Sequence, residues 1–438
     1  MELLSKSVKG TQDILPEESY KWKFIEDVML NESKVYGFKE IRTPVFEHTE
    51  LFNRTVGEDT DVVQKEMYTF NDKSGRSLTL KPEGTAAVAR AILEHGLFND
   101  ALPIKVSYLT PCYRYEKPQS GRYREFHQFG IEMFGADSPA ADAEIICMAI
   151  TLFERLNITG LTLEINSIGC PVCRKKYKEK LKEYFLQNKN GLCKTCLDRL
   201  DRNPMRIVDC KNPQCQEISK NAPNIIDYLC DDCKNHFEKL KLYLDNENII
   251  YKVNPKIVRG LDYYTKTVFE FVADNDKNRG LVCGGGGRYD GLIEELGGPK
   301  MSAIGFGIGI ERLLMYMESQ NIEIPDLQSC DVFIASLDQK SSIKAFELTR
   351  VLREASFMAE FDTVGRSLKS QLKYADKIKA RFSVVIGETE LNDNKAKIKN
   401  MKTGQQFDIR LDDKFLSDFF LIDAQCELNQ QQENIETV

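Results

Sequence analysis

The spacing of hydrophobic residues predicts both helices and strands in the first part of the chain. Between Trp22 and Met29 apolar residues recur at helical spacing, which predicts an amphipathic helix packed on a core. Short runs of β-branched and aromatic residues predict strands at 77–80, 104–109 and 124–134. Strands interleaved with helices indicate a mixed α and β domain up to about residue 165.

One face of the predicted strand 124–134 carries Phe126, Gln128, Gly130 and Glu132. Successive side chains of a strand point to opposite faces, so these four point the same way. Such a face meets solvent or lines a ligand site, and the spacing alone leaves both readings open. His127 points to the opposite face, and we do not expect it to act in catalysis.

The pattern changes between 170 and 240, where eight of the thirteen cysteines lie in lysine-rich helical sequence. From Val253 the β-rich pattern resumes, and we therefore expect the first domain to be split by an inserted segment. The later predicted features are a strand at 267–272, a glycine run at 284–287, a strand at 304–310 and a helix at 312–317.

A third region begins after a predicted linker at 318–330, which contains Pro325 and scattered polar residues. Strand and helix patterns alternate in this region, which predicts an α/β unit. Its predicted elements are a strand at 332–336, a helix at 346–352, a basic helical stretch at 366–381 and a strand at 382–386. We expect the tail 427–438, with its three consecutive glutamines, to be disordered.

The composition of the 438-residue chain predicts a multidomain globular protein. Apolar residues make up 42% and charged residues 29%, which excludes disordered and collagen-like classes. No apolar run reaches the about 18 residues that a membrane helix needs, and the first residues lack an export signal. We therefore expect a cytoplasmic protein with no membrane partner. The net charge of −7 argues against a uniformly basic nucleic-acid binder, although a local basic patch stays open.

Eight cysteines form four closely spaced pairs, and this spacing favours metal binding. Disulfide frameworks are typical of short secreted chains, which this chain does not resemble. Two tetrahedral four-cysteine zinc sites of structural type would use all eight thiols; regulatory disulfides and a partly retained metal site are the alternatives. The pairs are Cys170 and Cys173, Cys193 and Cys196, Cys210 and Cys215, and Cys230 and Cys233. The other five cysteines are expected to be buried small apolar residues.

Two segments carry candidate nucleotide chemistry. The run 113–116 (YRYE) and the run 124–128 (REFHQ) flank a polar loop, and together they offer arginines, carboxylates and aromatic rings. Guanidinium groups match phosphate oxygens, a carboxylate accepts from an exocyclic amine, and an aromatic ring stacks on a base. A charged surface hairpin is the alternative reading.

The second segment, 305–313 (GFGIGIERL), alternates glycine with apolar residues before an arginine. Glycine weakens a strand, and it usually occurs there because a ligand or another backbone approaches closely. Neither a Walker-type loop nor a dinucleotide fingerprint occurs, so phosphates must be held by arginines.

These two segments resemble the second and third signature motifs of class II aminoacyl-tRNA synthetases, and 41–44 (IRTP) resembles the first, dimer-forming motif. Four further runs resemble signatures of the histidyl-tRNA synthetase family, and the resemblance extends over 1–425. These runs are 9–13 (KGTQD), 81–85 (KPEGT), 259–264 (RGLDYY) and 286–292 (GGRYDGL).

The resemblance implies a homodimer. Its α+β catalytic domain is expected to have the class II synthetase fold with a six-stranded antiparallel sheet. A Cys-rich, mainly helical insertion and a C-terminal α/β anticodon-binding domain are expected as well. The expected bounds are 1–169 and 246–325 for the catalytic domain, 170–245 for the insertion and 330–426 for the anticodon-binding domain. The cysteine pairs are not part of the pattern that defines catalysis, so zinc would belong to a subset of the family.

The resemblance also implies ATP-dependent ligation of L-histidine to tRNA(His) through a histidyl-adenylate, with Mg²⁺ accompanying ATP and no DNA partner. Arg259 matches the catalytic arginine. The expected histidine-binding residues are Glu83, Gly84, Thr85, Gln128, Glu132, Arg259, Tyr263 and Tyr264. The expected ATP-binding residues are Arg114, Glu116, Phe126 and Arg312. Gln119 and Arg122 are candidates for the tRNA acceptor end, and the basic stretch 366–381 is a candidate for tRNA phosphates.

Two rival functions are left open at this point. One is a non-catalytic synthetase-like regulatory subunit of ATP phosphoribosyltransferase, which is expected to lack the anticodon-binding domain and arginines such as Arg259. The other is a zinc-dependent nucleic-acid-binding module on a vestigial synthetase body. The latter explains the cysteines but does not require the ATP and amino-acid residues to be present together.

Overall fold

The computed structural model describes residues 5–58, 60–119, 121–274, 278–325 and 330–436. The chain divides into two compact units, Met1–Ile324 and Pro325–Val438. The predicted insertion 170–245 lies within the first unit, and its bounds as a separate domain stay a prediction. Among the described residues, no helix has the length and apolar character needed to cross a membrane.

An eight-stranded sheet forms the centre of the first unit, which corrects the predicted six strands. The six inner strands are antiparallel, and each edge carries one more strand that runs parallel to its neighbour. In spatial order the strands are β1 (Lys39–Glu40), β5 (Ile104–Tyr113), β6 (Glu125–Phe134), β11 (Ala303–Gly309), β10 (Val282–Arg288), β9 (Thr265–Ala273), β7 (Leu161–Ser167) and β8 (Tyr251–Val253). The two edge strands have only two and three residues, too few to show a two-residue period in the sequence.

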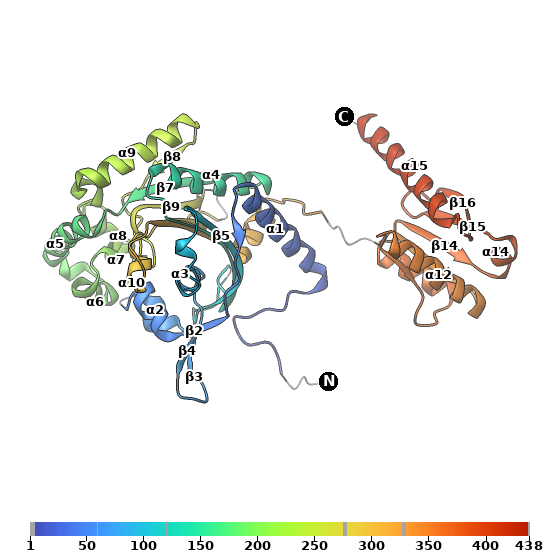
Figure 1. Ribbon diagram of the computed structural model, residues 1–438, viewed down its shortest axis with the longest axis horizontal. Helices are drawn as coiled ribbons and strands as arrows, with labels where there is room; N and C mark the ends of the chain where they lie inside the picture. Colours follow the sequence, from blue (N-terminus) through green and yellow to red (C-terminus); the bar gives the residue numbers. More distant parts are fainter. Residues whose placement is uncertain (1–4, 59, 120, 275–277, 326–329, 437–438) are drawn as a thin grey trace. The chain divides into compact units, whose positions relative to one another are not determined.

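Helices cover one face of this sheet and form its larger core. They are α1 (Pro16–Val35), α4 (Pro139–Arg155), α9 (Asp231–Asn246) and α11 (Ile310–Ser319). Trp22, Ile25 and Met29 of α1 are buried in this core, as the helical spacing predicted. Helices α4 and α9 pack against each other above β7 and β9 (Figure 1). The odd-numbered positions of β6, such as Phe129 and Ile131, point into this core, so the even-numbered ones point to the opposite face.

The opposite face supports the candidate site. It is flanked by α2 (Thr49–Val56), α3 (Thr85–Glu94), α10 (Leu292–Glu295) and a small sheet in the order β2 (Phe46–His48), β4 (Ser77–Leu80), β3 (Thr69–Asn71). The Cys-rich segment contributes α5 (Pro171–Gln187), α6 (Lys194–Arg202), α7 (Met205–Val208) and α8 (Pro213–Ser219), whose apolar residues share a second core with α3.

The second unit is a five-stranded α/β sheet, as the alternating pattern predicted. Its strands lie in the order β13 (Ala359–Phe361), β12 (Val332–Ser336), β14 (Phe382–Ile386), β15 (Lys395–Asn400), β16 (Gln406–Arg410). Its helices are α12 (Gln339–Glu354), α13 (Leu368–Lys377), α14 (Glu388–Asp393) and α15 (Phe415–Glu436).

The predicted disordered tail instead continues helix α15 as far as Glu436, while 437–438 lie outside the described residues. The sequence from Glu427 to Glu436 contains neither glycine nor proline and is rich in glutamate and glutamine. Both residue types have high helix propensity, so the helix that begins at Phe415 meets no local signal to stop.

Candidate active site

A cleft of about 850 Å³ opens on the strand face opposite the helical core. Six residues predicted from three separate stretches of sequence line it together: Arg114, Glu116, Phe126, Gln128, Arg259 and Arg312. The acceptor-end candidates Gln119 and Arg122 line it as well. The structure therefore decides between the two readings of the polar strand face, because Gln128 faces a cleft and Glu132 is buried, with only 1% of its surface exposed.

Two arginines are fixed in the wall of this cleft by backbone carbonyls. Arg114 donates from Nε to the carbonyl oxygen of Pro82 at 2.9 Å, and its guanidinium carbon lies 5.3 Å from the centre of the Phe126 ring. Arg312 donates from Nε to the carbonyl oxygen of Gly121 at 3.0 Å, and burial lowers its pKa. Two fixed cations beside an aromatic ring suit a flat ligand that carries phosphates.

The loop between β5 and β6 forms one rim of the cleft. Gln119 and Arg122 bond to each other through their backbones, with Arg122 N donating to the Gln119 carbonyl oxygen at 2.8 Å. Arg122 also donates to the Glu116 carboxylate at 3.4 Å. Arg124 stacks on the Tyr115 ring at 3.9 Å. These contacts hold the charged loop above the predicted nucleotide residues.

Arg259 is held in the cleft by a carboxylate and an aromatic ring. Its Nη1 donates to Glu270 Oε1 at 2.6 Å, and its guanidinium carbon lies 5.5 Å from the centre of the Tyr264 ring. Burial opposes its charge, but Tyr264 and Glu270 raise the pKa of Arg259, so the guanidinium stays charged. Its backbone φ of 55° lies in the left-handed region, which costs a residue with a side chain about 1–3 kcal/mol. Among the described residues its buried Nε has no hydrogen-bond partner, which leaves a donor free for an anionic ligand.

Glu132 lies beneath the cleft and accepts hydrogen bonds from three hydroxyl groups. These come from Thr85 Oγ1 at 2.7 Å, Tyr108 Oη at 3.2 Å and Tyr289 Oη. Burial raises the pKa of Glu132 to about 8, although the hydroxyl donors oppose this shift. Neither tyrosine was assigned a role from the sequence. The only sequence signal for Tyr289 is its place within the run 286–292. Tyr108 lies opposite Gly130 on the same strand face, which becomes visible only once β5 and β6 are paired.

The predicted residues of the run 81–85 lie beside this carboxylate. Glu83 accepts from the backbone N–H groups of Thr85 at 2.7 Å and Ala86 at 2.8 Å, so it caps the first turn of α3. Burial raises the pKa of Glu83, and the two backbone donors act against this change. Gln128 Oε1 accepts from the backbone N–H of Gly84 at 3.1 Å and joins this turn to the cleft wall.

Tyr263 and Tyr264 are buried side by side, with ring centroids 4.6 Å apart. The Tyr263 ring also lies 5.5 Å from that of Tyr289, which bonds to Glu132. The predicted histidine-binding residues thus form one connected group below the cleft, and Arg259 and Gln128 link that group to the predicted ATP residues.

The alternating glycines of β11 make room for this group. A Cβ on Gly305 would lie 1.9 Å from Glu132 Oε2, and one on Gly307 would lie 2.3 Å from Gln128 Nε2. A Cβ on Gly309 would meet no atom within 4 Å among the described residues, and Gly309 lines the cleft. Two of the three spaces are therefore filled by polar side chains of the neighbouring strand, and the third is open.

His127 lies on the opposite strand face, as predicted. Its ring packs edge-on against Trp22 with centroids 5.0 Å apart, and its Nδ1 lies 3.0 Å from Glu311 Oε1. The Glu311 carboxylate also accepts from the His127 backbone N–H. This contact fixes Glu311, whose neighbour Arg312 lines the cleft.

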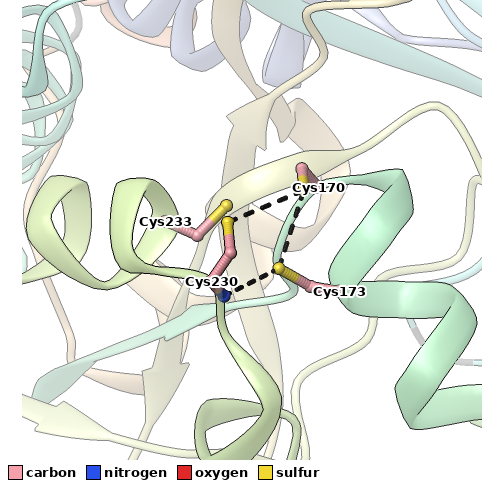
Figure 2. A group of neighbouring side chains, drawn as sticks. All are labelled: Cys170, Cys173, Cys230 and Cys233. Atoms are coloured by element: carbon pink, nitrogen blue, oxygen red, sulfur yellow. Dashed lines mark hydrogen bonds between the residues drawn. The ribbon is translucent and has the colours of Figure 1, made fainter.

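The eight paired cysteines gather into two clusters, and all thirteen cysteines are free thiols. The outer cluster contains Cys170, Cys173, Cys230 and Cys233, whose sulfurs converge between α5 and α9 (Figure 2). The inner cluster contains Cys193, Cys196, Cys210 and Cys215. In each cluster the four Sγ atoms lie within 4.8 Å of one another. Of the other five cysteines, Cys147 is half-buried and the rest are buried, as expected.

The sulfur spacing fits zinc better than disulfides. The Sγ atoms of Cys170 and Cys173 lie 3.6 Å apart, those of Cys170 and Cys230 lie 4.0 Å apart, and those of Cys193 and Cys210 lie 3.9 Å apart. A disulfide requires about 2.05 Å, whereas tetrahedral Zn–S bonds of about 2.3 Å separate neighbouring sulfurs by about 3.8 Å. Backbone N–H groups of Cys230 and Cys193 donate to sulfurs at 3.1 and 3.2 Å, a contact that favours thiolates.

In the second unit, the basic stretch 366–381 is partly neutralised. Arg366 pairs with Asp362 at 2.7 Å, and Arg381 pairs with Asp331 at 2.9 Å. The α13 lysines stay exposed at four-residue spacing, and no ion pair joins them to another described residue. These lysines are Lys369, Lys373 and Lys377.

Comparison with known proteins agrees with this arrangement. A family model described as histidyl-tRNA synthetase matches residues 10–174 and 214–313, and one described as anticodon binding domain matches 331–415. The residues between the two matched parts of the first model, 175–213, contain three of the four cysteines of the inner cluster, Cys193, Cys196 and Cys210.

Individual relatives match almost the whole chain. The histidine–tRNA ligase of Clostridium novyi is 57% identical over 403 residues, which is 92% of this chain and 96% of the relative. The crystal structure of apo histidyl-tRNA synthetase from S. aureus is 41% identical with a TM-score of 0.80, covering 93% of this chain and 98% of that one. A third match is a structure from Bacillus halodurans described as an ATP phosphoribosyltransferase regulatory subunit/histidyl-tRNA synthetase. It is 22% identical with a TM-score of 0.64, and the match covers 88% of this chain and 99% of that one. At this identity the match shows a shared fold alone. Together with the cleft and its residues, these matches show that the chain belongs to the histidyl-tRNA synthetase family.

Proposed function

We propose that this chain ligates L-histidine to tRNA(His) in two steps. Histidine and ATP first form histidyl-adenylate with release of diphosphate, and the histidyl group then passes to the 3′-terminal adenosine of the tRNA with release of AMP. The observation that carries this proposal is the convergence of Arg114, Arg259 and Arg312 on one cleft, whose wall at Gln128 connects through Gly84 and Thr85 to the buried carboxylate of Glu132.

ATP is proposed to occupy the cleft with its adenine beside Phe126 and Glu116. A ring can stack on the base, and a carboxylate can accept from the exocyclic amine. Arg114 would bind the α-phosphate and Arg312 the γ-phosphate. Because both arginines are already fixed by backbone carbonyls, they lose little freedom when they bind phosphate.

Histidine is proposed to occupy the space between the cleft and Glu132. Its imidazole would contact Glu132 and Tyr264, and its α-amino group would contact Glu83, Thr85 and Gln128, with Gly84 and Tyr263 shaping the site. A site that hydrogen-bonds both ring nitrogens rejects amino acids without them, because its own buried polar groups would be left unpaired.

Arg259 is proposed to stabilise charge at the α-phosphate while the histidine carboxylate attacks phosphorus. Its guanidinium is held by Glu270 and keeps a buried donor free, so little reorganisation is needed during the reaction. Mg²⁺ would supply charge neutralisation of the other phosphates. The carboxylates of Glu270 and Glu311 line the same cleft and offer the oxygen ligands that Mg²⁺ takes.

The remaining assignments concern zinc, tRNA and assembly. We propose one structural zinc ion in each cysteine cluster, on the sulfur spacing given above. Gln119 and Arg122 would touch the tRNA acceptor end, and the α13 lysines would attract phosphates of the anticodon region. We further propose a homodimer through the motif at 41–44, acting in the cytoplasm where tRNA is charged.

The regulatory-subunit alternative is less well supported. That reading predicted loss of the anticodon-binding domain and of arginines such as Arg259, whereas this chain has both. The fold alone does not separate the two functions, because a protein described by both names has a similar one.

Amino-acid-dependent exchange of pyrophosphate into ATP tests the first step of this proposal. We expect exchange with histidine and none above background with the other nineteen amino acids. Exchange with another amino acid, or folded protein that gives no exchange with histidine, would contradict the proposed specificity or the proposed catalysis.

A further inference from the structure

The two cysteine clusters are nested along the chain. The outer cluster joins the start of α5 to the start of α9, at Cys170–Cys173 and Cys230–Cys233, and so closes the whole segment between them. The inner cluster joins the start of α6 to the residues around α8, within that segment. Each cluster therefore fixes a different part of the segment.

The outer cluster lies next to a direct contact with the catalytic loop, which we define as residues 259–264. Arg174 follows Cys173 in α5, and its Nη1 donates to the carbonyl oxygen of Tyr264 at 2.8 Å. The backbone N–H of Lys266 also donates to the Gly169 carbonyl oxygen at 3.0 Å, one residue before Cys170. The last residue of the catalytic loop and the start of β9 are thus bonded to residues on either side of the first cysteine pair.

The inner cluster reaches the start of the same loop. Arg206 lies in α7, between Cys196 and Cys210, and its Nη1 donates to the carbonyl oxygen of Arg259 at 2.7 Å. Asn203, in the same stretch, donates from Nδ2 to Asp262 Oδ1 at 3.1 Å. The inner cluster therefore lies on the polypeptide that holds the loop at Arg259 itself.

These contacts matter because the backbone of the loop belongs to no strand, and the sheet holds Arg259 only through its side chain, at Glu270 of β9. The loop precedes β9, which begins at Thr265, and its first residue has the left-handed φ of 55°. A left-handed residue other than glycine persists only where its surroundings enforce it. Arg206 lies in α7, which has only four residues, and the neighbouring helix α8 has seven. Helices of this length are not stable by themselves, so their positions depend on packing in the second core and on the cross-links at the cysteines.

We infer that the two clusters, each holding one zinc ion, position the catalytic loop, the outer through Arg174 and the inner through Arg206. Loss of either metal ion frees one end of the loop and displaces the Arg259 guanidinium from the α-phosphate. Arg174 and Arg206 are positioning residues, since both act through backbone carbonyls of the loop. This inference rests on the proposed ligase function for its kinetic consequence, but not for its structural one.

Metal content is the first part of the test. We expect inductively coupled plasma mass spectrometry to find two zinc ions per chain in the purified protein. Cys233→Ser and Cys196→Ser should each reduce this content to one. A chain that holds no metal, or that has formed disulfides at these cysteines, would overturn the inference.

The second part separates positioning from metal binding. Arg206→Met and Arg174→Met should keep two zinc ions, while the rate of adenylate formation falls at least tenfold. Arg206 also lines the cleft, so the ATP affinity is compared in Arg174→Met, where it should stay at the wild-type value. Arg206→Lys should recover part of the rate, because an ammonium group can donate to the same carbonyl. Arg202→Met on α6 and Lys176→Met on α5 are matched controls, since both side chains are exposed, and they should keep the wild-type rate.

Hydrogen exchange gives a readout that does not depend on activity. Backbone amides of 259–264 should exchange faster in Arg206→Met and in the two cysteine variants than in the wild type and the controls. If the wild type shows no histidine-dependent exchange of pyrophosphate, the proposed function fails, yet this comparison still tests the inference. Unchanged amide exchange in the cysteine variants, with one zinc ion lost, would overturn it.

Discussion

Replacing Arg259 by methionine removes one charge from the cleft while it keeps most of the side-chain volume. If the attacked phosphoryl group lies about 4 Å from the guanidinium, unit charges interact by about 4 kcal/mol at an effective dielectric constant of about 20. Each 1.36 kcal/mol changes a rate about tenfold, so adenylate formation should slow by about 10³-fold. ATP affinity should change much less, because Arg114 and Arg312 are the residues proposed to hold the phosphates before the reaction.

The assay is single-turnover formation of histidyl-adenylate by rapid quench, together with equilibrium binding of ATP. Arg259→Met leaves Glu270 without its partner at 2.6 Å, so Glu270→Gln and the double variant are required controls. The double variant should be no faster than Arg259→Met alone, since the missing cation, not the unpaired carboxylate, causes the loss. Glu270→Gln alone measures any loss that comes from the proposed contact of Glu270 with Mg²⁺. A rate loss below tenfold, or an equal loss of ATP affinity, would refute the electrostatic reasoning.

The remaining predictions concern the β11 glycines, a buried carboxylate and the α13 lysines. Gly305→Ala puts a Cβ 1.9 Å from Glu132 Oε2 and 2.2 Å from the Ile131 carbonyl oxygen, so both the stability of the protein and its kcat/KM for histidine should fall, the latter about 100-fold. Gly309→Ala should leave the KM for histidine unchanged. The pKa of Glu132 rises on folding from 4.5 to about 8, so between these pH values the folded chain binds one proton more than the unfolded chain. The folded state should therefore lose up to about 5 kcal/mol of stability as the pH rises from 4.5 to 8. The free energy of unfolding, measured with urea, should fall less between pH 5 and pH 8 in Glu132→Gln than in the wild type. Equal decreases in the two proteins would contradict the reasoning. Replacing the three α13 lysines by alanine should raise the KM for tRNA(His) several-fold and weaken its salt dependence, while pyrophosphate exchange stays unchanged.

Four of the six inner strands of the catalytic sheet, β5, β6, β9 and β11, could be predicted because their signals are local, whereas β7 was not predicted and β10 was expected only as a glycine run. The glycine alternation at 305–309 predicted close approach, and the structure identifies the approaching groups as Glu132 and Gln128. The sequence could not distinguish a solvated strand face from a ligand-lining one. That choice depends on which face the helices cover, and the covering residues come from α1, α4, α9 and α11, far apart in the chain.

The grouping of the cysteines could not be predicted either. Four pairs can combine in several ways, and the nested arrangement depends on the path of the chain between α5 and α9. The same limit applies to Tyr108, Tyr289 and Arg206, whose partners lie 24, 157 and 53 residues away. Contacts over such separations follow from the completed fold and leave no periodic signal in the sequence.

Charging of tRNA(His) by the purified full-length chain tests the central claim most directly. We predict that labelled histidine becomes attached to tRNA(His) in an ATP-dependent reaction, and that no other amino acid becomes attached to it. Stoichiometric binding of tRNA(His) and ATP without formation of histidyl-tRNA would contradict the claim and favour a regulatory role for the same fold.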